Sequence, residues 1–212
     1  MDFFSILNRM NKIFEYLYWK DRVHFDATTR ISRQATIRGG QGIYIGANSV
    51  ISEHAILNCT DSPFSPSITR ILKPKGEIHL GNMTKIRPFA CIFTYGGKIV
   101  IGQNCSLNPF SIIYGHGNVT IGNNVRIAAH CVIVGSSHNF GDLDVPITNQ
   151  GINCRGITIE DDVWIASGVK ILDGVHIGNK SIIAAGAVVN RDVPSKCIMG
   201  GVPAKIIKQR GL

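Results

Sequence analysis

Residues 157–189 read ITIEDDVWIASGVKILDGVHIGNKSIIAAGAVV, and an aliphatic residue returns at every sixth position of this stretch. A period of six carries apolar side chains around every face of an α-helix, and it is not the simple alternation of a half-buried strand. It does fit a three-sided prism in which each hexad forms one short strand and one corner. The same repeat forms six in-register triplets, whose aliphatic residues are Ile45, Ile51, Leu57; Leu80, Ile86, Ile92; Ile101, Leu107, Ile113; Ile121, Ile127, Ile133; Ile159, Ile165, Ile171; and Ile177, Ile183, Val189.

The residues between these aliphatic positions fit the corners of the prism. The opening hexads of the triplets begin with IGANS, LGNMT, IGQNC, IGNNV, IEDDV and IGNKS. Gly and Asn tolerate the left-handed backbone conformation that a tight corner requires. We therefore predict an all-β parallel β-helix of about six to seven coils over residues 30–205. An amphipathic helical segment over 1–29 is expected before it, and a short basic tail over 206–212 after it.

Composition and charge narrow the classes of function. The formal net charge is +8, but Lys and Arg never run longer than two residues and no nucleic-acid-binding motif is present, so we expect no nucleic acid partner. Charges interrupt the apolar residues of the N-terminal segment, which predicts neither a signal peptide nor a spanning helix. We therefore expect a cytoplasmic protein with reduced cysteines, which are Cys59, Cys91, Cys105, Cys131, Cys154 and Cys197. No two of them have the spacing of metal ligands, so we expect no metal requirement.

Interruptions of the repeat indicate where binding residues lie, because such residues favour loops on a rigid scaffold. The interruptions fall at about 63–79, 96–100, 117–120 and 139–158. The first and the last are the longest, and we place the loops that contain them at 58–79 and 134–158. Each follows the third hexad of a coil, so all are predicted to emerge at one corner. His138 lies near the base of the longest interruption, and His116 lies one coil earlier at the same corner.

Particular motifs resemble a known family. SHNF at 137–140, VPITNQG at 145–151, the hexads from 157 and GGVPAK at 200–205 are similar to the galactoside/maltose acetyltransferase branch of the hexapeptide-repeat acyltransferase superfamily. They are more similar still to relatives that O-acetylate bacterial surface polysaccharides such as O-antigen, capsule or exopolysaccharide. The resemblance covers roughly residues 30–205. It implies a left-handed coil, a homotrimer, and transfer of an acetyl group from acetyl-CoA to a sugar hydroxyl.

The resemblance also implies roles for individual residues. It makes His138 the catalytic base, a role suited to an imidazole because a sugar hydroxyl is a poor nucleophile at neutral pH. A backbone N–H at the position of Ser167 would stabilise the oxyanion. Asn108 and His116 match acceptor-contacting positions, but His116 replaces an acidic residue, which favours an anionic or differently shaped sugar. Asp142 and Asp144 either orient the imidazole or only solvate the loop.

Further residues match positions that contact the cofactor in that branch, and they are Ser167, Ala185, Asn190, Arg191, Lys205 and Lys208. The branch has a Thr-Lys pair where Asn190-Arg191 stands, and Arg where Lys205 and Lys208 stand. Positive charge for the phosphates of acetyl-CoA is therefore kept, while the bidentate geometry of arginine is lost at the last two positions.

Several alternatives remain open at the level of the sequence. The same fold would suit an antibiotic O-acetyltransferase, a zinc carbonic-anhydrase-like β-helix with three His ligands between subunits, or a non-catalytic trimeric scaffold. The apolar residues of the N-terminal segment, from Phe3 to Tyr18, recur at helical spacing. This helix either packs against the prism or a neighbouring subunit, or makes peripheral contact with the inner face of a membrane.

Overall fold

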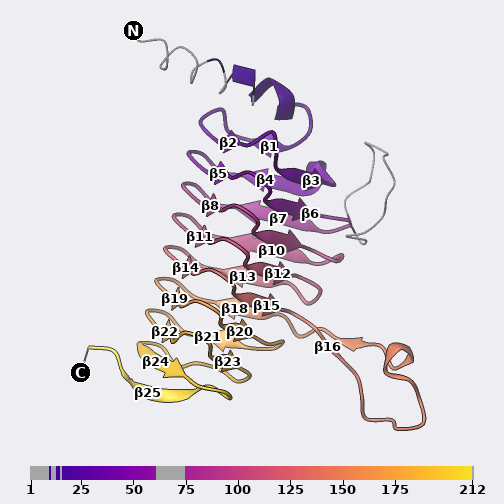
Figure 1. Cartoon of the computed structure of the whole chain (residues 1–212), viewed down its shortest axis with the longest axis vertical. Helices are drawn as coiled ribbons and strands as arrows, with labels where there is room; N and C mark the ends of the chain where they lie inside the picture. Colours follow the sequence, from indigo (N-terminus) through magenta and orange to yellow (C-terminus); the bar gives the residue numbers. More distant parts are fainter. Residues whose placement is uncertain (1–9, 11–12, 15, 61–74, 212) are drawn as a thin grey trace.

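The chain winds into a three-sided column of stacked coils (Figure 1). The computed structural model describes residues 10, 13–14, 16–60 and 75–211. The described chain begins and ends at opposite ends of the column, and one long loop projects from its side (Figure 1). Three parallel sheets form the walls, which confirms the prism predicted from the six-residue period.

The walls are named sheets A, B and C in the order in which each coil visits them. Sheet A contains β1 (His24–Phe25), β4 (Ile43–Ile45), β7 (Glu77–Leu80), β10 (Lys98–Ile101), β13 (Val119–Ile121), β18 (Ile157–Ile159) and β21 (His176–Ile177). Sheet B contains β2 (Arg30–Ile31), β5 (Val50–Ile51), β8 (Lys85–Ile86), β11 (Ser106–Leu107), β14 (Arg126–Ile127), β19 (Trp164–Ile165), β22 (Ile182–Ile183), β24 (Cys197–Gly200) and β25 (Lys205–Gln209). Sheet C contains β3 (Thr36–Arg38), β6 (Ile56–Asn58), β9 (Cys91–Phe93), β12 (Ile112–Tyr114), β15 (Val132–Val134), β20 (Lys170–Ile171) and β23 (Val188–Val189).

Columns of aliphatic side chains fill the interior of the prism. The register sets Ile121 beside Ile159 and Ile159 beside Ile177, so equivalent residues of successive coils stack directly. Every aliphatic residue of the six triplets is buried. Full burial of one such side chain stabilises a fold by about 1.5–3 kcal/mol, and this burial is the main contribution that holds the coils together.

The corners rely on left-handed backbone, as the recurring Gly and Asn residues predicted. At the corner between sheets A and B, Asn48, Asn104 and Asn124 have φ values of 56°, 52° and 59°. Asn adopts this conformation at little cost because its short polar side chain bonds locally. These corners let the chain turn sharply without interrupting the stack.

Both ends of the coiled region extend beyond the predicted limits. The first coil begins at His24 in β1, which pairs with β4, rather than at residue 30. At the other end, residues 205–209 are not a free tail, because β25 pairs antiparallel with β24. This pairing satisfies backbone groups that β24 would otherwise leave open at the last coil.

The N-terminal segment is helical where it is described, at Met10, Ile13–Phe14 and 16–19. Trp19 is only 5% exposed and belongs to the same apolar core as Val23, so the last helical turn packs against the first coil. Phe3, Phe4, Ile6 and Leu7 lie outside the described residues. No helix in the described part of the chain is long and apolar enough to span a bilayer.

Candidate active site

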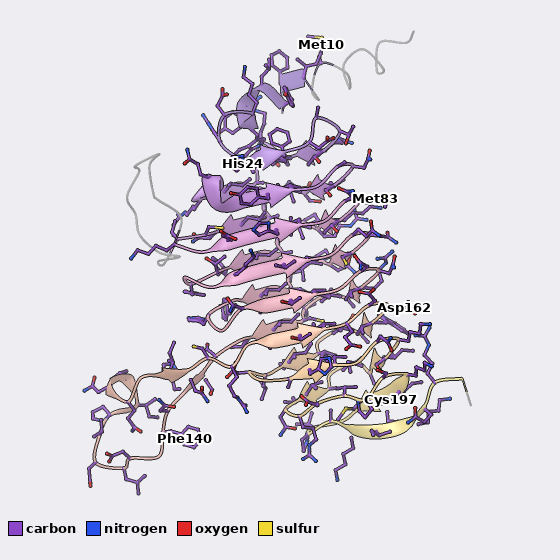
Figure 2. The ribbon with its side chains drawn as sticks, turned by 180° about the vertical axis from the view of Figure 1, so that it is seen from behind. Met10, His24, Met83, Phe140, Asp162 and Cys197 are labelled. Atoms are coloured by element: carbon purple, nitrogen blue, oxygen red, sulfur yellow. The ribbon has the colours of Figure 1, made fainter. Side chains whose placement is uncertain are left out.

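Every longer connection in the described chain leaves the column where it passes from sheet C to sheet A, which we call the C–A corner. These connections join β9 to β10, β12 to β13, and β15 to β18. The third is residues 135–156, the loop that stands away from the column, with Phe140 far from the stacked coils (Figure 2). The common corner predicted from the repeat is thus confirmed for these segments; residues 61–74 fall outside the described part.

His138 lies at the base of this loop on β16 (Ser137–His138). This short strand pairs antiparallel with β17 (Ile152–Asn153), and His138 faces Ile152 across the pair. The ladder fixes the backbone of His138 between the outgoing and returning arms of the loop, while its side chain is exposed. An exposed imidazole on an anchored backbone is accessible to a substrate hydroxyl.

Hydrogen bonds within the loop hold its outer part in shape. The Gln150 side-chain amide donates to the carbonyl oxygens of Asp142 at 2.7 Å and Val145 at 2.6 Å. The Asp142 carboxylate accepts the backbone N–H of Asp144 at 2.9 Å. The observed bond of the Asp142 carboxylate is therefore to the loop itself, in keeping with a structural rather than an imidazole-orienting role.

His116 stands beside a group of aromatic residues at the C–A corner. Its ring stacks on Tyr95, with 4.2 Å between the ring centroids and 13° between the planes, and meets Tyr114 edge-on. Tyr114 is aligned with Phe93 across the β9–β12 pair. We call Phe93, Tyr95, Tyr114 and His116 the aromatic corner. Phe93, Tyr95 and Tyr114 were not predicted as site residues. The signal for them in the sequence was the recurrence of aromatic residues at the end of two successive coils.

The position of His116 keeps its imidazole neutral. Partial burial lowers the pKa of His116, and the nearby His138 lowers that pKa further. Its Nδ1 atom is buried and has no hydrogen-bond partner within the described chain, so a second ring proton would be left unpaired. A neutral imidazole has no net attraction for an anion. Charge therefore gives no reason to expect an anionic sugar at His116. Of the two alternatives, a differently shaped sugar is the one that remains.

Asn108, Ser167 and Ala185 lie on a different corner, where the chain passes from sheet B to sheet C. They follow β11, β19 and β22, respectively, in this B–C corner. The Gly186 N–H donates to the Ser167 carbonyl at 2.9 Å, and the Gly168 N–H donates to that of Ala129 at 3.0 Å. Within the described chain, the Ser167 N–H has no such acceptor, so it is available to a ligand.

The other predicted cofactor residues lie near the C-terminal end of the column. Asn190 and Arg191 follow β23 at the last C–A corner, whereas Lys205 and Lys208 lie on β25. One protomer therefore does not gather all the predicted site residues. His116 and His138 are brought together, while Asn108, Ser167 and Ala185 lie across the width of sheet C from them.

The cysteines are free, and Cys59, Cys105, Cys131 and Cys197 are buried, as expected for small apolar residues. Burial raises the pKa of Cys59 to about 12, so its thiol stays protonated and is a poor nucleophile. In the described ranges, no three His, Cys, Asp or Glu side chains converge as metal ligands would.

The repeats match a known family in the part of the chain where they are most regular. Residues 156–191 fit the family described as bacterial transferase hexapeptide (six repeats). The repeats of this segment are those of hexapeptide-repeat transferases. The matched residues are the hexads of the last coils, directly after the His138 loop.

Relatives of this hexapeptide-repeat protein carry acetyltransferase names. It is 42% identical over 123 residues to the putative acetyltransferase YJL218W of Saccharomyces cerevisiae, covering 58% of this chain and 60% of that protein. It is 36% identical over 122 residues to galactoside O-acetyltransferase of Escherichia coli, covering 55% and 57%. Across the first three curated relatives, the chain spans between 43% and 60% of their lengths.

Solved structures of the family show the same fold. A maltose O-acetyltransferase from Clostridium difficile superposes with a TM-score of 0.57 at 28% identity, covering 63% of this chain and 70% of the other. Galactoside acetyltransferase in complex with coenzyme A superposes with a TM-score of 0.53 at 32% identity, covering 60% and 66%. The column is thus a left-handed parallel β-helix, as the resemblance implied.

Proposed function

We propose that this protein transfers the acetyl group of acetyl-CoA to a hydroxyl group of a saccharide. The observation that carries the proposal is the position of His138, exposed at the base of the one long described loop and next to His116 and its aromatic neighbours. The names of the galactoside and maltose O-acetyltransferases support a sugar hydroxyl as acceptor. The coenzyme A complex of the former supports acetyl-CoA as donor.

In the proposed reaction, the His138 imidazole accepts the proton of the sugar hydroxyl while the hydroxyl oxygen attacks the thioester carbonyl. The Ser167 backbone N–H, which has no acceptor in the described chain, would donate to the resulting oxyanion. Collapse of this tetrahedral intermediate breaks the carbon–sulfur bond, and the imidazolium returns its proton to the coenzyme A thiolate. The products are an acetyl ester and free coenzyme A, and no cysteine or metal takes part.

The aromatic corner supports an acceptor with an apolar ring face. Sugar rings present C–H groups on their faces, and these pack well against aromatic side chains, which offer a large surface at low entropic cost. Tyr95 and Tyr114 lie beside His116, on the same corner as His138. A sugar held there would present a hydroxyl close to the proposed base.

We further propose that the active site is shared between two protomers of a homotrimer. Within one protomer, His138 and the Ser167 N–H lie on different corners of the prism, so they do not act on the same thioester. Cyclic symmetry brings the C–A corner of one copy to the B–C corner of the next, and three equal copies close the ring. Asn108 and Ala185 would then face the His138 of a neighbouring protomer.

The biological setting is also part of the proposal. A relative that is 30% identical over 122 residues, covering 53% of this chain, is the putative lipopolysaccharide biosynthesis O-acetyl transferase WbbJ of Escherichia coli. Its name supports a role in bacterial surface polysaccharide biosynthesis. We propose that the protein acts in the cytoplasm, at the inner face of the membrane. The exposed apolar residues Ile13, Phe14 and Leu17 of the N-terminal helix would provide the membrane contact.

The first experiment measures coenzyme A release from acetyl-CoA in the presence of maltose, galactosides, nucleotide sugars, oligosaccharides and antibiotics. We expect turnover with a saccharide, and we expect His138→Ala to lower kcat by about 10²–10⁴-fold, the usual contribution of a general base. His54→Asn is the control, since it removes an exposed histidine on the B–C corner while keeping a residue that tolerates the left-handed backbone there. Turnover only with antibiotics, or full activity of His138→Ala, would contradict the proposal.

A second experiment tests the sharing of the site. His138→Ala removes the base, and Ala185→Trp fills the B–C corner, so each variant alone should be inactive. In randomly mixed trimers, a site is intact when a protomer with an unaltered His138 lies next to a protomer with an unaltered Ala185. Each condition holds for about half of the protomers, so roughly a quarter of wild-type activity should return. No recovery after co-refolding, with mixed trimers verified by mass, would place each site within a single protomer.

A further inference from the structure

The returning arm of the His138 loop is fastened to one buried carboxylate. Asp173 lies in the turn between β20 and β21, and its side chain is only 2% exposed. Its Oδ1 atom accepts the backbone N–H groups of Arg155 and Gly156, each at 2.9 Å. Its Oδ2 atom accepts the Arg155 N–H at 3.0 Å and lies 3.6 Å from the guanidinium Nε. We call these contacts the Asp173 clamp.

The clamp is reciprocal, because Arg155 also reaches back to the turn. Its guanidinium Nη2 donates to the Asp173 backbone carbonyl at 2.9 Å. A buried carboxylate is costly unless its oxygens are hydrogen-bonded and its charge is paired. Both oxygens of Asp173 meet this condition only while residues 155 and 156 stay where they are. Displacement of the returning arm would leave a buried charge without partners, so the clamp strongly favours one placement.

Close backbone contacts make this placement specific. Gly156 has φ of 83°, and a Cβ atom there would collide with the carbonyl oxygen of Gly117. A Cβ on Gly174, whose φ is 81°, would collide with the Arg155 guanidinium. The arm therefore re-enters the column through a passage that only glycine fits, one coil above the turn that holds Asp173.

The clamp is connected to His138 through a short run of backbone. Asn153 lies two residues before Arg155 and pairs with Ser137, while Ile152 pairs with His138. Beyond this ladder the loop is exposed, with Phe140 at 74% and Leu143 at 97%. The placement of His138 thus depends on two attachments, namely β15 on the outgoing side and Asp173 on the returning side.

We propose that Asp173 is a positioning residue, which holds the β16–β17 ladder so that the His138 imidazole meets the substrate hydroxyl. This inference rests on the proposed function for its catalytic part, since that proposal makes His138 the base. Misplacement of a catalytic group by about 1 Å can cost about 10²-fold in rate, even when the altered residue is remote from the chemistry. Asp173 contacts neither substrate nor cofactor in this scheme.

The experiment compares Asp173→Ala and Asp173→Asn with a matched control, Asp161→Ala, in the full-length protein. Asp161 also joins two coils through a carboxylate, which accepts the Asn123 N–H at 2.7 Å, but it lies at the corner between sheets A and B. Amide hydrogen exchange followed by mass spectrometry reports on residues 136–154. Acetyl transfer to maltose or a galactoside, at varied acetyl-CoA, reports on kcat and KM.

We expect Asp173→Ala to speed exchange in the loop by at least about tenfold while exchange in the flanking coils stays unchanged. We also expect kcat to fall by about 10–100-fold with an unchanged KM for acetyl-CoA. Asp173→Asn should give smaller changes of both kinds, because its amide oxygen still accepts an N–H while its NH₂ group faces a donor. Asp161→Ala should change neither quantity.

The outcomes separate this inference from the proposed function. Unchanged loop exchange in both Asp173 variants overturns the clamp, whatever the activity. Faster loop exchange with unchanged kcat, in an enzyme that His138→Ala inactivates, overturns the positioning role. If His138→Ala keeps full activity, the proposed function fails, while the exchange data still decide whether Asp173 holds the loop. If Asp173→Ala does not fold, the same comparisons are made with Asp173→Asn.

Discussion

His116 shows how a single residue changes the character of the C–A corner. Its imidazole stacks on Tyr95, and partial burial lowers the pKa of the ring. A neutral ring with one sealed nitrogen binds by contact and by one remaining polar atom, not by charge. Selectivity at this corner would therefore depend on the shape of the acceptor.

The lowered pKa of His116 predicts how stability depends on pH. In the unfolded chain, His116 takes up a proton as pH falls through about 6.5, whereas in the folded chain it does so only at lower pH. The unfolded state therefore binds more protons in this interval, and the free energy of unfolding falls on acidification. His116→Gln should reduce the loss of Tm between about pH 7.5 and pH 5.5, as measured by thermal melts at several pH values.

The control for this experiment is His54→Asn, which removes an exposed imidazole from the B–C corner and keeps a residue that tolerates the left-handed backbone there. If His116→Gln and the wild type lose the same amount of Tm on acidification, His116 does not titrate differently in the folded and unfolded states.

The coil is the element in which local sequence and global fold agree most closely. Ile92 on β9 is fully buried in the aliphatic column. Ile92→Ala should lower the free energy of unfolding by about 2–5 kcal/mol, because it removes buried methylene groups and leaves a cavity. Thr120→Ala, on the exposed face of β13, should change it by less than about 0.5 kcal/mol. Urea titrations of both variants would measure the difference, and an equal effect of the two would contradict the assignment of the core.

This agreement explains how much of the fold the sequence predicts. Strict repetition determines which side chains face inward, so the column and the corner of the interruptions follow from residues such as Ile121 and Ile159 alone. The ends do not follow, because β1 and β25 have no hexad pattern and depend on pairing with a neighbouring strand. His138 and His116 were found at one corner by register, whereas their aromatic neighbours required a view of which side chains touch.

The Asp173 clamp was beyond sequence reasoning for a related reason. Its partners lie 17 and 18 residues away along the chain and belong to a loop without periodicity. In the sequence, Asp173 is one polar residue in the turn ILDGV, and many corner residues are polar. Only its burial and the direction of two N–H groups distinguish it from an ordinary corner residue.

At the scale of the whole molecule, the long loop is the feature that favours packing against another copy of the chain. It stands away from its own column and exposes Phe140 and Leu143, which a monomer would leave in water (Figure 1). In the proposed trimer these side chains pack on a neighbouring copy. Light scattering coupled to gel filtration should therefore give three chain masses for the wild type and one for the double variant Phe140→Asp with Leu143→Asp.

Asp144→Asn is the matched control for the loop, because it alters a polar residue in the same segment without adding charge to an apolar one. It should remain trimeric. A trimeric mass for the double variant would show that other surfaces hold the copies together. A single chain mass for the wild type would contradict the proposed oligomer and, with it, the sharing of the active site.

The antiparallel strand β25 has a consequence for solubility. A stack of identical coils has no intrinsic stopping point, since the last coil offers the same unpaired backbone edge to a new coil as to a strand from another molecule. β25 reverses direction and pairs antiparallel with β24, so it covers the edge to which a further parallel strand would add. The first coil of a second molecule does not match the antiparallel edge that results. Trp19 covers the opposite end of the core. The two unlike ends keep a self-similar solenoid from growing into a fibre.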